Sequence, residues 1–365
     1  MNLPKKPMNL AMVAGARPNF MKIAPLIAAF NGDSCFDINL IHTGQHYDQN
    51  MSESFFRDLR IPEPRHRLQV GSGSHAQQTA EIMKRIEPVF IQDEVEAVVV
   101  VGDVNSTVAA ALVAAKLDIR VIHAEAGLRS FDRTMPEEIN RLVTDSISDL
   151  LLVTEESGRT NLLREGRDPK QIVLVGNLMV DSLRHNLNEA MDSDILTRLQ
   201  VCGCFGLVTL HRPANVDNDG KLTEILSALS EIAEDLPLYW PLHPRTRTKI
   251  NGIGLPSAIH LLDPLGYRDF LHMQAKASVI LTDSGGIQEE STVLGTPCLT
   301  LRDNTERPVT VEAGTNRLAG TSKVSILNAW QESKESPKAG AIPELWDGQA
   351  GVRCHAAIRG FLLPS

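Results

Sequence analysis

The sequence has few cysteines and no excess of basic residues. Of its 365 residues, 36 are lysine or arginine and 45 are aspartate or glutamate, which gives a formal net charge of −9. This balance argues against nucleic acid as a partner, although it leaves room for a local basic pocket. Only Cys202 and Cys204 of the five cysteines lie close together, and no second Cys or His pair stands at zinc-site spacing. We therefore expect free thiols and no metal.

The sequence also lacks a later apolar run long enough to span a bilayer. Its opening, MNLPKKPMNLAMVAGA, superficially resembles a signal peptide, because two lysines precede an apolar run and small residues. The same residues fit a first strand that turns into a helix at NLAMVAGARPNF. We interpret them as this strand, and we expect a cytoplasmic protein without membrane insertion.

Several catalytic signatures are missing as well. There is no Ser-His-Asp order, no P-loop, and no G-x-G-x-x-G after the first strand. A nicotinamide-dependent enzyme is therefore poorly supported, and we expect no cofactor.

What the sequence does contain is a regular alternation of short apolar runs with helical patterns. Runs such as AVVVV, LLLVT and ASVILT show no polar alternation, which indicates parallel strands covered by helices on both faces. Because 365 residues exceed what one hydrophobic core usually serves, we predict an α/β protein with two doubly wound, Rossmann-like domains. The predicted domains are residues 1–178 and 179–348, and a helix within 349–365 is expected to pack back on the first.

Almost every polar cluster directly follows one of the predicted strands. GARPNFMK, HTGQHYD, GDVNST and HAEAGLRS do so in the first half, and LHRPAN, LHPRTR and DSGG in the second. Ligands of doubly wound sheets bind outside the carboxyl ends of the strands. We therefore expect these loops to line a ligand cleft between two facing domains.

The stretch TDSGGIQEE, Thr282 to Glu290, is predicted to lie where a strand turns into a helix. Unpaired N–H groups at a helix start favour an anion such as phosphate, and a carboxylate one turn later is well placed for sugar hydroxyls. The alternative is an ordinary N-cap in a tight turn.

Several carboxylates occupy comparable positions in the first half. Asp103 follows Gly102 and is either a base or the cap of the next helix. Glu125 ends an apolar strand, so we expect it to point into the cleft from a partly buried site. Burial there would raise the pKa of this carboxyl group, and nearby Arg129 or Arg133 would oppose the increase.

Acidic and basic residues at other predicted element ends complete the candidates. Glu137 and Glu138 stand in a first helical turn, where acids often only complement the helix dipole. His211-Arg212 and a second His-Arg pair, His243 with Arg245, follow two strands of the second half, and their guanidinium groups suit phosphate. The remaining basic candidates are Arg17, Lys22 and Arg307. These residues predict an enzyme that binds a phosphorylated sugar or nucleotide.

The motifs GARPNFMKIAPL, TGQHYD, VVGDVNST, HAEAGLRSFDRTMPEEINR, LHRPANVDN, DPLGYRDFL, TDSGGIQEE and RDNTERP occur in this order. Together they resemble the non-hydrolysing UDP-N-acetylglucosamine 2-epimerases over nearly the whole chain. That family has the two-domain glycosyltransferase-B architecture and is commonly dimeric, so the resemblance implies a UDP-sugar substrate and a homodimer.

The resemblance also implies roles for individual residues. The implied catalytic residues are Asp103, Glu125, Glu137 and, at the leaving diphosphate, His211. The implied substrate-binding residues are Arg17, Lys22, Gln45, Arg212, His243, Leu265, Phe270, Ser284, Gly285, Gly286, Glu290 and Arg307. Among these, the glycine turn would hold the UDP diphosphate, Glu290 the ribose hydroxyls, and Leu265 with Phe270 the uracil ring.

The family reaction inverts C2 of the GlcNAc moiety of UDP-GlcNAc to give UDP-ManNAc. It proceeds by elimination of UDP to 2-acetamidoglucal and re-addition, which requires cations at the diphosphate and carboxylates on both faces of C2. No metal or nicotinamide takes part, and which carboxylate is acid and which is base stays open. Asp48 stands where self-activated members often have glutamine, which argues against a second, activating UDP-GlcNAc site. Arg17-Pro18 argues against the hydrolysing branch.

Three alternatives share these features. A 2-epimerase of a modified UDP-HexNAc, such as UDP-2,3-diacetamido-glucuronic acid, would use the same chemistry. A glycosyltransferase would share the architecture and the nucleotide site without needing carboxylates on both sides of C2. A sugar-nucleotide sensor would bind UDP-GlcNAc without turnover.

Overall fold

The computed structural model describes residues 6–44, 56, 58–242 and 244–363, except for the side chains of Arg17, Pro244 and Arg245. The chain forms two compact units, Met1–Ser182 together with Glu344–Ser365, and Leu183–Pro343. None of the helices within the described ranges has the length and apolar character that a membrane span requires.

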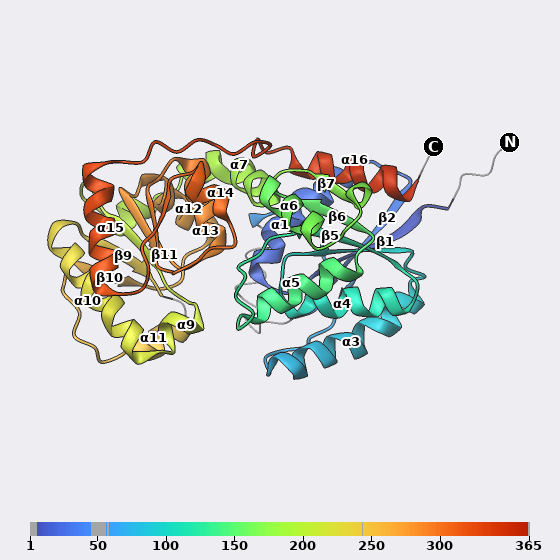
Figure 1. Cartoon of the computed structure of the whole chain (residues 1–365), viewed down its shortest axis with the longest axis horizontal. Helices are drawn as coiled ribbons and strands as arrows, with labels where there is room; N and C mark the ends of the chain where they lie inside the picture. The colour runs from blue at the N-terminus through green and yellow to red at the C-terminus, as the bar shows by residue number, and fades with distance from the viewer. Residues whose placement is uncertain (1–5, 45–55, 57, 243, 364–365) are drawn as a thin grey trace. The chain divides into compact units, whose positions relative to one another are not determined.

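The first unit is built on a seven-stranded sheet in the order β3-β2-β1-β4-β5-β6-β7. Figure 1 labels β1, β2, β5, β6 and β7 of this sheet. Every pairing described in it is parallel. Its strands are β1 (Met8–Ala14), β2 (Phe36–His42), β3 (His66–Arg67), β4 (Ala97–Val101), β5 (Arg120–Ala126), β6 (Leu150–Val153) and β7 (Ile172–Leu174). β2 and β4 pair with opposite sides of β1. The loops that follow β1 and β4 therefore run in opposite directions, which makes the carboxyl ends of these two strands the topological switch point of the sheet.

Helices connect these parallel strands. They are α1 (Arg17–Phe30), α3 (His75–Gln92), α4 (Asn105–Lys116), α5 (Pro136–Ile147), α6 (Glu156–Arg164) and the 3₁₀ helix η1 (Pro169–Gln171). After β7, α7 (Leu178–Met191) continues past Ser182 into the second unit, and α16 (Ala350–Leu362) returns to the first. In α3, a capping box forms, because Ser74 Oγ accepts from the Gln77 amide and Gln77 Oε1 accepts from the Ser74 amide. Buried residues Ile82, Ile86 and Phe90 recur every four positions and give this helix one apolar face.

The second unit contains a six-stranded sheet in the order β10-β9-β8-β11-β12-β13, again parallel in every described pairing. Its strands are β8 (Gly206–Thr209), β9 (Leu238–Pro241), β10 (Ile259–Leu262), β11 (Val279–Thr282), β12 (Cys298–Thr300) and β13 (Asn316–Leu318). Its helices are α8 (Ile195–Arg198), α9 (Pro213–Val216), α10 (Asp219–Asp235), α11 (Pro244–Ile250), α12 (Tyr267–Lys276), α13 (Gly285–Leu294), α14 (Pro308–Glu312) and α15 (Lys323–Glu335).

The predicted fold class is confirmed, because both units alternate parallel strands with helices. The reason is visible in β4, whose AVVVV run is buried along its whole length. A strand that meets helices on both faces has no polar face, and β-branched residues pack well in that setting.

The C-terminal helix α16 packs on α1 within the first unit. Its first amides, at Ala350 and Gly351, donate to the carboxylate of Asp181 at 3.1 and 2.7 Å. Burial raises the pKa of Asp181, although the two backbone donors oppose this effect. The backbone of Gly351 lies so close to α1 that an added Cβ would meet the Pro25 carbonyl oxygen at 2.7 Å.

We predict that Gly351→Ala destabilises the protein by about 1–3 kcal/mol, since the new methyl group must push α16 away from the backbone of α1. Gly360→Ala is the matched control, because this exposed glycine of the same helix has nothing within 4 Å of an added Cβ. Helix propensity alone should make that variant more stable, by up to about 1 kcal/mol. Chemical denaturation followed by circular dichroism measures both, and an equal effect of the two substitutions would contradict the proposed packing.

Candidate functional site

The first group of candidate residues lies at the carboxyl ends of β1, β4 and β5. Asn19 connects two of these ends, because its Oδ1 accepts from the amides of Gly15 and Ala16 at 3.2 and 3.1 Å. Its Nδ2 donates to the Val101 carbonyl at 2.8 Å. This buried side chain therefore fastens the turn between β1 and α1 to the end of β4.

Glu125 occupies a bulge in β5. Ala124 pairs with Leu152 and Ala126 with Val153, so Glu125 is the extra residue between them. Its φ is 70°, a left-handed conformation that is unfavourable for a side chain of this size and that clusters at functional sites. The bulge turns the Glu125 side chain away from the ladder of hydrogen bonds between β5 and β6. The position of Glu125 at the end of a predicted strand did not reveal this bulge.

The carboxylate of Glu125 forms an ion pair with the ammonium group of Lys22, which comes from the second turn of α1. Both side chains are less than a tenth exposed. Gly102 allows this approach, since a Cβ on it would lie 3.1 Å from Glu125 Oε2 and 3.2 Å from Lys22 Nζ. Two residues predicted for separate roles, anion binding and catalysis, thus form one buried pair.

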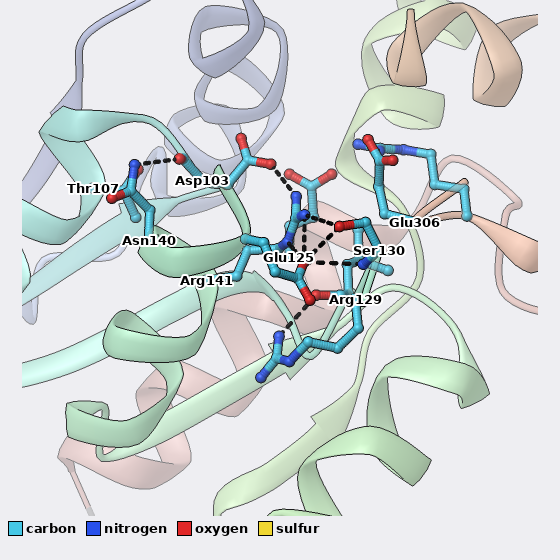
Figure 2. A network of polar contacts seen from close by, with 12 residues as sticks. Asp103, Thr107, Glu125, Arg129, Ser130, Asn140, Arg141 and Glu306 are labelled. Atoms are coloured by element: carbon cyan, nitrogen blue, oxygen red, sulfur yellow. Dashed lines mark hydrogen bonds and ion pairs between the residues drawn. The ribbon is translucent and has the colours of Figure 1, made fainter. Parts of the chain in front are cut away.

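Asp103 is held by Arg141 of α5, whose Nη1 donates to Asp103 Oδ2 at 2.5 Å (Figure 2). The side chain of Arg141 is 2% exposed, whereas that of Asp103 is 28% exposed. Asp103 does not cap α4, because Val104 takes the N-cap position without a side-chain bond. The helix-cap alternative is therefore wrong, and Asp103 remains a partly open carboxylate beside the Glu125 strand.

The adjacent acids Glu137 and Glu138 have different surroundings. Glu138 is buried and accepts from the amides of Ser130 and Phe131 at 2.9 and 3.0 Å and from Arg141 Nη2 at 2.6 Å. Burial raises the pKa of Glu138, but these donors outweigh it and hold the pKa below its usual value. Glu137 is half-buried and has no hydrogen-bond or ion-pair partner within the described part of the chain.

A buried network lies beneath Asp103 and Glu125. His123 Nε2 donates to the Gly102 carbonyl at 2.8 Å, and its Nδ1 bonds to Asp145 Oδ1 at 2.6 Å. Asp145 Oδ2 accepts from the Gly127 amide at 3.1 Å and pairs with Arg129 at 2.7 Å. The network therefore fixes the backbone next to both carboxylates.

Arg129 has two carboxylate partners that the sequence did not predict. Its guanidinium group pairs with Asp145 and with Glu165, at 2.7 Å in each case. Its hydrogen bonds serve these two carboxylates and the Leu128 carbonyl, so Arg129 is part of the supporting network beneath Glu125.

The second group of candidates surrounds the start of α13. Ser284 stands at the N-cap, but its side chain caps no amide of the first turn. The N–H groups of Gly285, Gly286 and Ile287 therefore receive no acceptor from that side chain, as expected of a helix start that binds an anion. The ordinary side-chain N-cap is not what this turn forms.

Arg212 and Arg307 both reach this turn. Arg307 Nη1 lies 2.5 Å from where a Cβ of Gly285 would be, so only glycine lets the guanidinium group rest against the backbone there. Arg212 Nε donates to the Asp283 carbonyl at 3.0 Å. The structure thus brings together the glycine turn and two of the arginines predicted for phosphate, Arg212 and Arg307.

His211 is oriented by Asp283, a residue that the sequence analysis missed. Asp283 is fully buried and accepts from the amide of Arg212 at 2.9 Å, while its Oδ1 lies 3.0 Å from His211 Nδ1. Burial raises the pKa of Asp283, but His211 and the backbone donors hold it below its usual value. Because Nδ1 faces Asp283, this buried carboxylate sets the orientation of the His211 ring.

Glu290 lies one turn further along α13 and is buried. Tyr267 Oη donates to its Oε1 at 3.1 Å, and Gln274 Nε2 donates to its Oε2 at 2.6 Å. Leu265 and Phe270 pack, half-buried, on the same apolar cluster as Ile287 of α13. The residues predicted for ribose and uracil therefore belong to one end of the second unit.

The predictions for five residues are not tested by the structure. Gln45, Asp48 and His243 lie outside the described residues, and for Arg17 and Arg245 only the backbone is described. Within the described ranges, no three His, Cys, Asp or Glu side chains are grouped as metal ligands.

Comparison with known proteins gives consistent matches. The family model for UDP-N-acetylglucosamine 2-epimerase matches residues 28–359. A UDP-N-acetylglucosamine 2-epimerase of Methanocaldococcus jannaschii is 43% identical over 88% of this chain and 91% of its own length. A UDP-2,3-diacetamido-2,3-dideoxy-D-glucuronate 2-epimerase of Pseudomonas aeruginosa is 40% identical over 89% of this chain and 92% of its own. The crystal structure of the M. jannaschii enzyme with UDP-GlcNAc and UDP covers 96% of this chain and 99% of its own, with 42% identity and a TM-score of 0.90.

We predict that Arg141→Met lowers the free energy of unfolding by about 3 kcal/mol, because it leaves Glu138 buried without its cation. Arg159→Met is the control, since Arg159 pairs with Glu156 at 3.5 Å on an exposed helix face and should contribute less than about 0.5 kcal/mol. Urea denaturation of both variants measures the difference. Similar losses would show that Arg141 is no more important to the fold than a surface arginine.

Stability should also depend on pH through Asp145. Burial raises the pKa of this carboxyl group, but His123 and Arg129 outweigh burial and hold it below its unfolded value of about 4. Its stabilising contribution is therefore complete above about pH 4 and is lost as the pH falls further. Asp145→Asn should be less stable than the unmodified chain at pH 7, with a difference that shrinks below about pH 4. Urea titrations across this range test the trend, and a difference that grows toward acid would contradict it.

Proposed function

Since this chain belongs to the UDP-N-acetylglucosamine 2-epimerase family, we propose that it inverts C2 of the GlcNAc moiety of UDP-GlcNAc to give UDP-ManNAc. The observation that carries the residue assignments is the buried Glu125–Lys22 pair on a strand bulge, next to the Arg141-bound Asp103. Carboxylates with defined positions at one sheet edge are what proton transfer at a sugar carbon requires.

The second unit is proposed to hold UDP. The amides at the start of α13 and the guanidinium group of Arg307 suit the diphosphate. Glu290, fixed by Tyr267 and Gln274, is placed to accept hydrogen bonds from the ribose hydroxyls. The backbone of Leu265 and the ring of Phe270 are proposed to receive uracil, and both residues pack on an apolar cluster of this unit.

The chemistry explains why both kinds of group are needed. The C2 proton is not next to a carbonyl group, so its direct removal to a carbanion is very costly. When a base takes this proton, the C2–H electrons form the C1–C2 double bond and the C1–O bond breaks, which releases UDP. UDP then adds back to C1 of 2-acetamidoglucal, and C2 is protonated on the other face.

Each catalytic group has a proposed part in these steps. Asp103, Glu125 and Glu137 are the carboxylates that exchange protons with C2. Of these, Glu137 lacks a described partner, Asp103 is held by Arg141, and Glu125 is neutralised by Lys22. His211, whose ring is oriented by Asp283, is proposed to assist at the departing diphosphate. Gln45 and His243 remain substrate-binding predictions from resemblance.

A modified sugar is the second candidate substrate, and the 40% identical P. aeruginosa relative favours it. By its name, that relative acts on a 2,3-diacetamido-glucuronate, and its chemistry at C2 would use the same carboxylates.

We also propose that the chain works as a homodimer in the cytoplasm. The family resemblance supports the dimer, and the five free cysteines support a reducing compartment. Light scattering of the purified chain would test the dimer.

Incubation with UDP-GlcNAc in heavy water tests the reaction. We predict that the unmodified chain incorporates deuterium at C2 and forms UDP-ManNAc, as followed by NMR. Glu125→Gln should lower this exchange by at least about 100-fold while UDP affinity stays within about twofold. Glu156→Gln, an exposed acid of α6, is the control and should exchange normally.

The outcomes separate the alternatives. Exchange only with the diacetamido-glucuronate nucleotide would identify the modified sugar as the substrate. UDP binding without exchange on either nucleotide sugar would favour a transferase or a sensor over an epimerase. Undiminished exchange in Glu125→Gln would remove Glu125 from the mechanism.

A further inference from the structure

Three arginines of the second unit converge on one carboxylate, Glu306. Arg212 Nη2 and Arg307 Nη1 lie 2.9 and 2.8 Å from its Oε1, and Arg302 Nη2 lies 2.7 Å from its Oε2. The side chain of Glu306 is 2% exposed. Of these four residues, only Arg212 and Arg307 were predicted from the sequence to bind substrate.

The three arginines come from different parts of the unit. Arg212 is the N-cap of α9, Arg302 follows β12, and Arg307 is the N-cap of α14. Three guanidinium groups in this space repel one another, and Glu306 is the anion that all three share. Arg307 has a second anionic partner, because its Nε also donates to the buried Glu289 Oε1 at 2.6 Å. Burial raises the pKa of Glu306, but Arg212, Arg307 and Arg302 together lower it far more. The carboxylate is therefore ionised and ties the three loops together.

The cluster lies directly behind the proposed diphosphate site. A Cβ added to Gly285 would lie 3.1 Å from Glu306 Oε1 and 2.5 Å from Arg307 Nη1. Glu306 on Nη1 and Glu289 on Nε thus together set where the guanidinium group of Arg307 rests relative to the first amides of α13. Of these two carboxylates, only Glu306 also binds Arg212.

Arg302 adds an unmatched donor to this cluster. It is 6% exposed, and its Nη1 is buried without a hydrogen-bond partner among the described residues. Its Nη2 serves Glu306 and Asn304, at 2.7 and 3.1 Å. A buried guanidinium N–H without an acceptor is rare, and an anionic oxygen is the acceptor that suits it best.

On the basis of the function proposed above, we propose that Glu306 is a positioning residue for the diphosphate, with Arg302 as the third cation of the same cluster. Glu306 touches no substrate atom in this role. It fixes Arg212 and Arg307 in the geometry that receives the diphosphate oxygens. A carboxylate beside a diphosphate would by charge alone weaken binding, so positioning and simple electrostatics predict opposite effects of its removal.

Glu306→Gln tests this difference, because it removes the charge and keeps the side-chain size. We expect calorimetry to show UDP affinity lowered by at least about 10-fold, because Arg212 and Arg307 lose their shared anion. Affinity for uridine, which lacks the diphosphate, should stay within about twofold. Glu312→Gln is the matched control, since Glu312 is an exposed acid of α14, and both affinities should be unchanged.

Each other result has a definite meaning. Unchanged or tighter UDP binding by Glu306→Gln would overturn the positioning role, as would an equal loss of UDP and uridine binding, which indicates a general effect on the fold. Arg302→Met is the second variant, and it tests the proposal even when Glu306→Gln cannot be obtained in folded form. It should weaken UDP by about threefold or more without affecting uridine, and unchanged UDP affinity would overturn the proposal. Failure of the unmodified chain to bind UDP would instead reject the proposed function.

Discussion

The ion pair between Lys22 and Glu125 is the interaction on which the carboxyl edge of the first sheet depends. It joins the first helix to the fifth strand and requires a bulge, a left-handed glutamate and a glycine at position 102. A buried charge without its partner would be far less stable than a buried pair, so the surrounding backbone has to meet these demands together. The strained conformation of Glu125 persists because the network of His123 and Asp145 holds the neighbouring backbone.

Both units use the same physical arrangement around their candidate residues. A fully buried carboxylate accepts several hydrogen bonds and remains ionised, and it holds a more exposed group in place. Glu138 does this through Arg141 for Asp103, and Asp283 does it for His211. Burying such a carboxylate costs desolvation free energy, so each ion pair adds little to the stability of the fold. Its effect is to fix the orientation of the side chain that it binds.

The sequence was sufficient to predict the fold class and most of the loops that carry candidate residues. Unbroken apolar runs identify strands buried on both faces, and the strand-end rule then places the following polar residues on one edge. It could not show which side chains pair across long separations. Lys22 and Glu125 are 103 positions apart, and hydrophobic periodicity says nothing about that contact. For the same reason Asp103 was left open as a helix cap, and the pairing of Arg129 with Asp145 and Glu165 was not predicted.

The first unit is discontinuous in the chain, because its last helix is residues Ala350–Leu362. During synthesis on the ribosome, the whole second unit emerges before this helix does. Until then the surface of α1 that receives Gly351 stays uncovered, and the carboxylate of Asp181 lacks its two amide donors. The second unit can therefore complete its folding first, and the Lys22 helix gains its final support only after residues Ala350–Leu362 have left the ribosome.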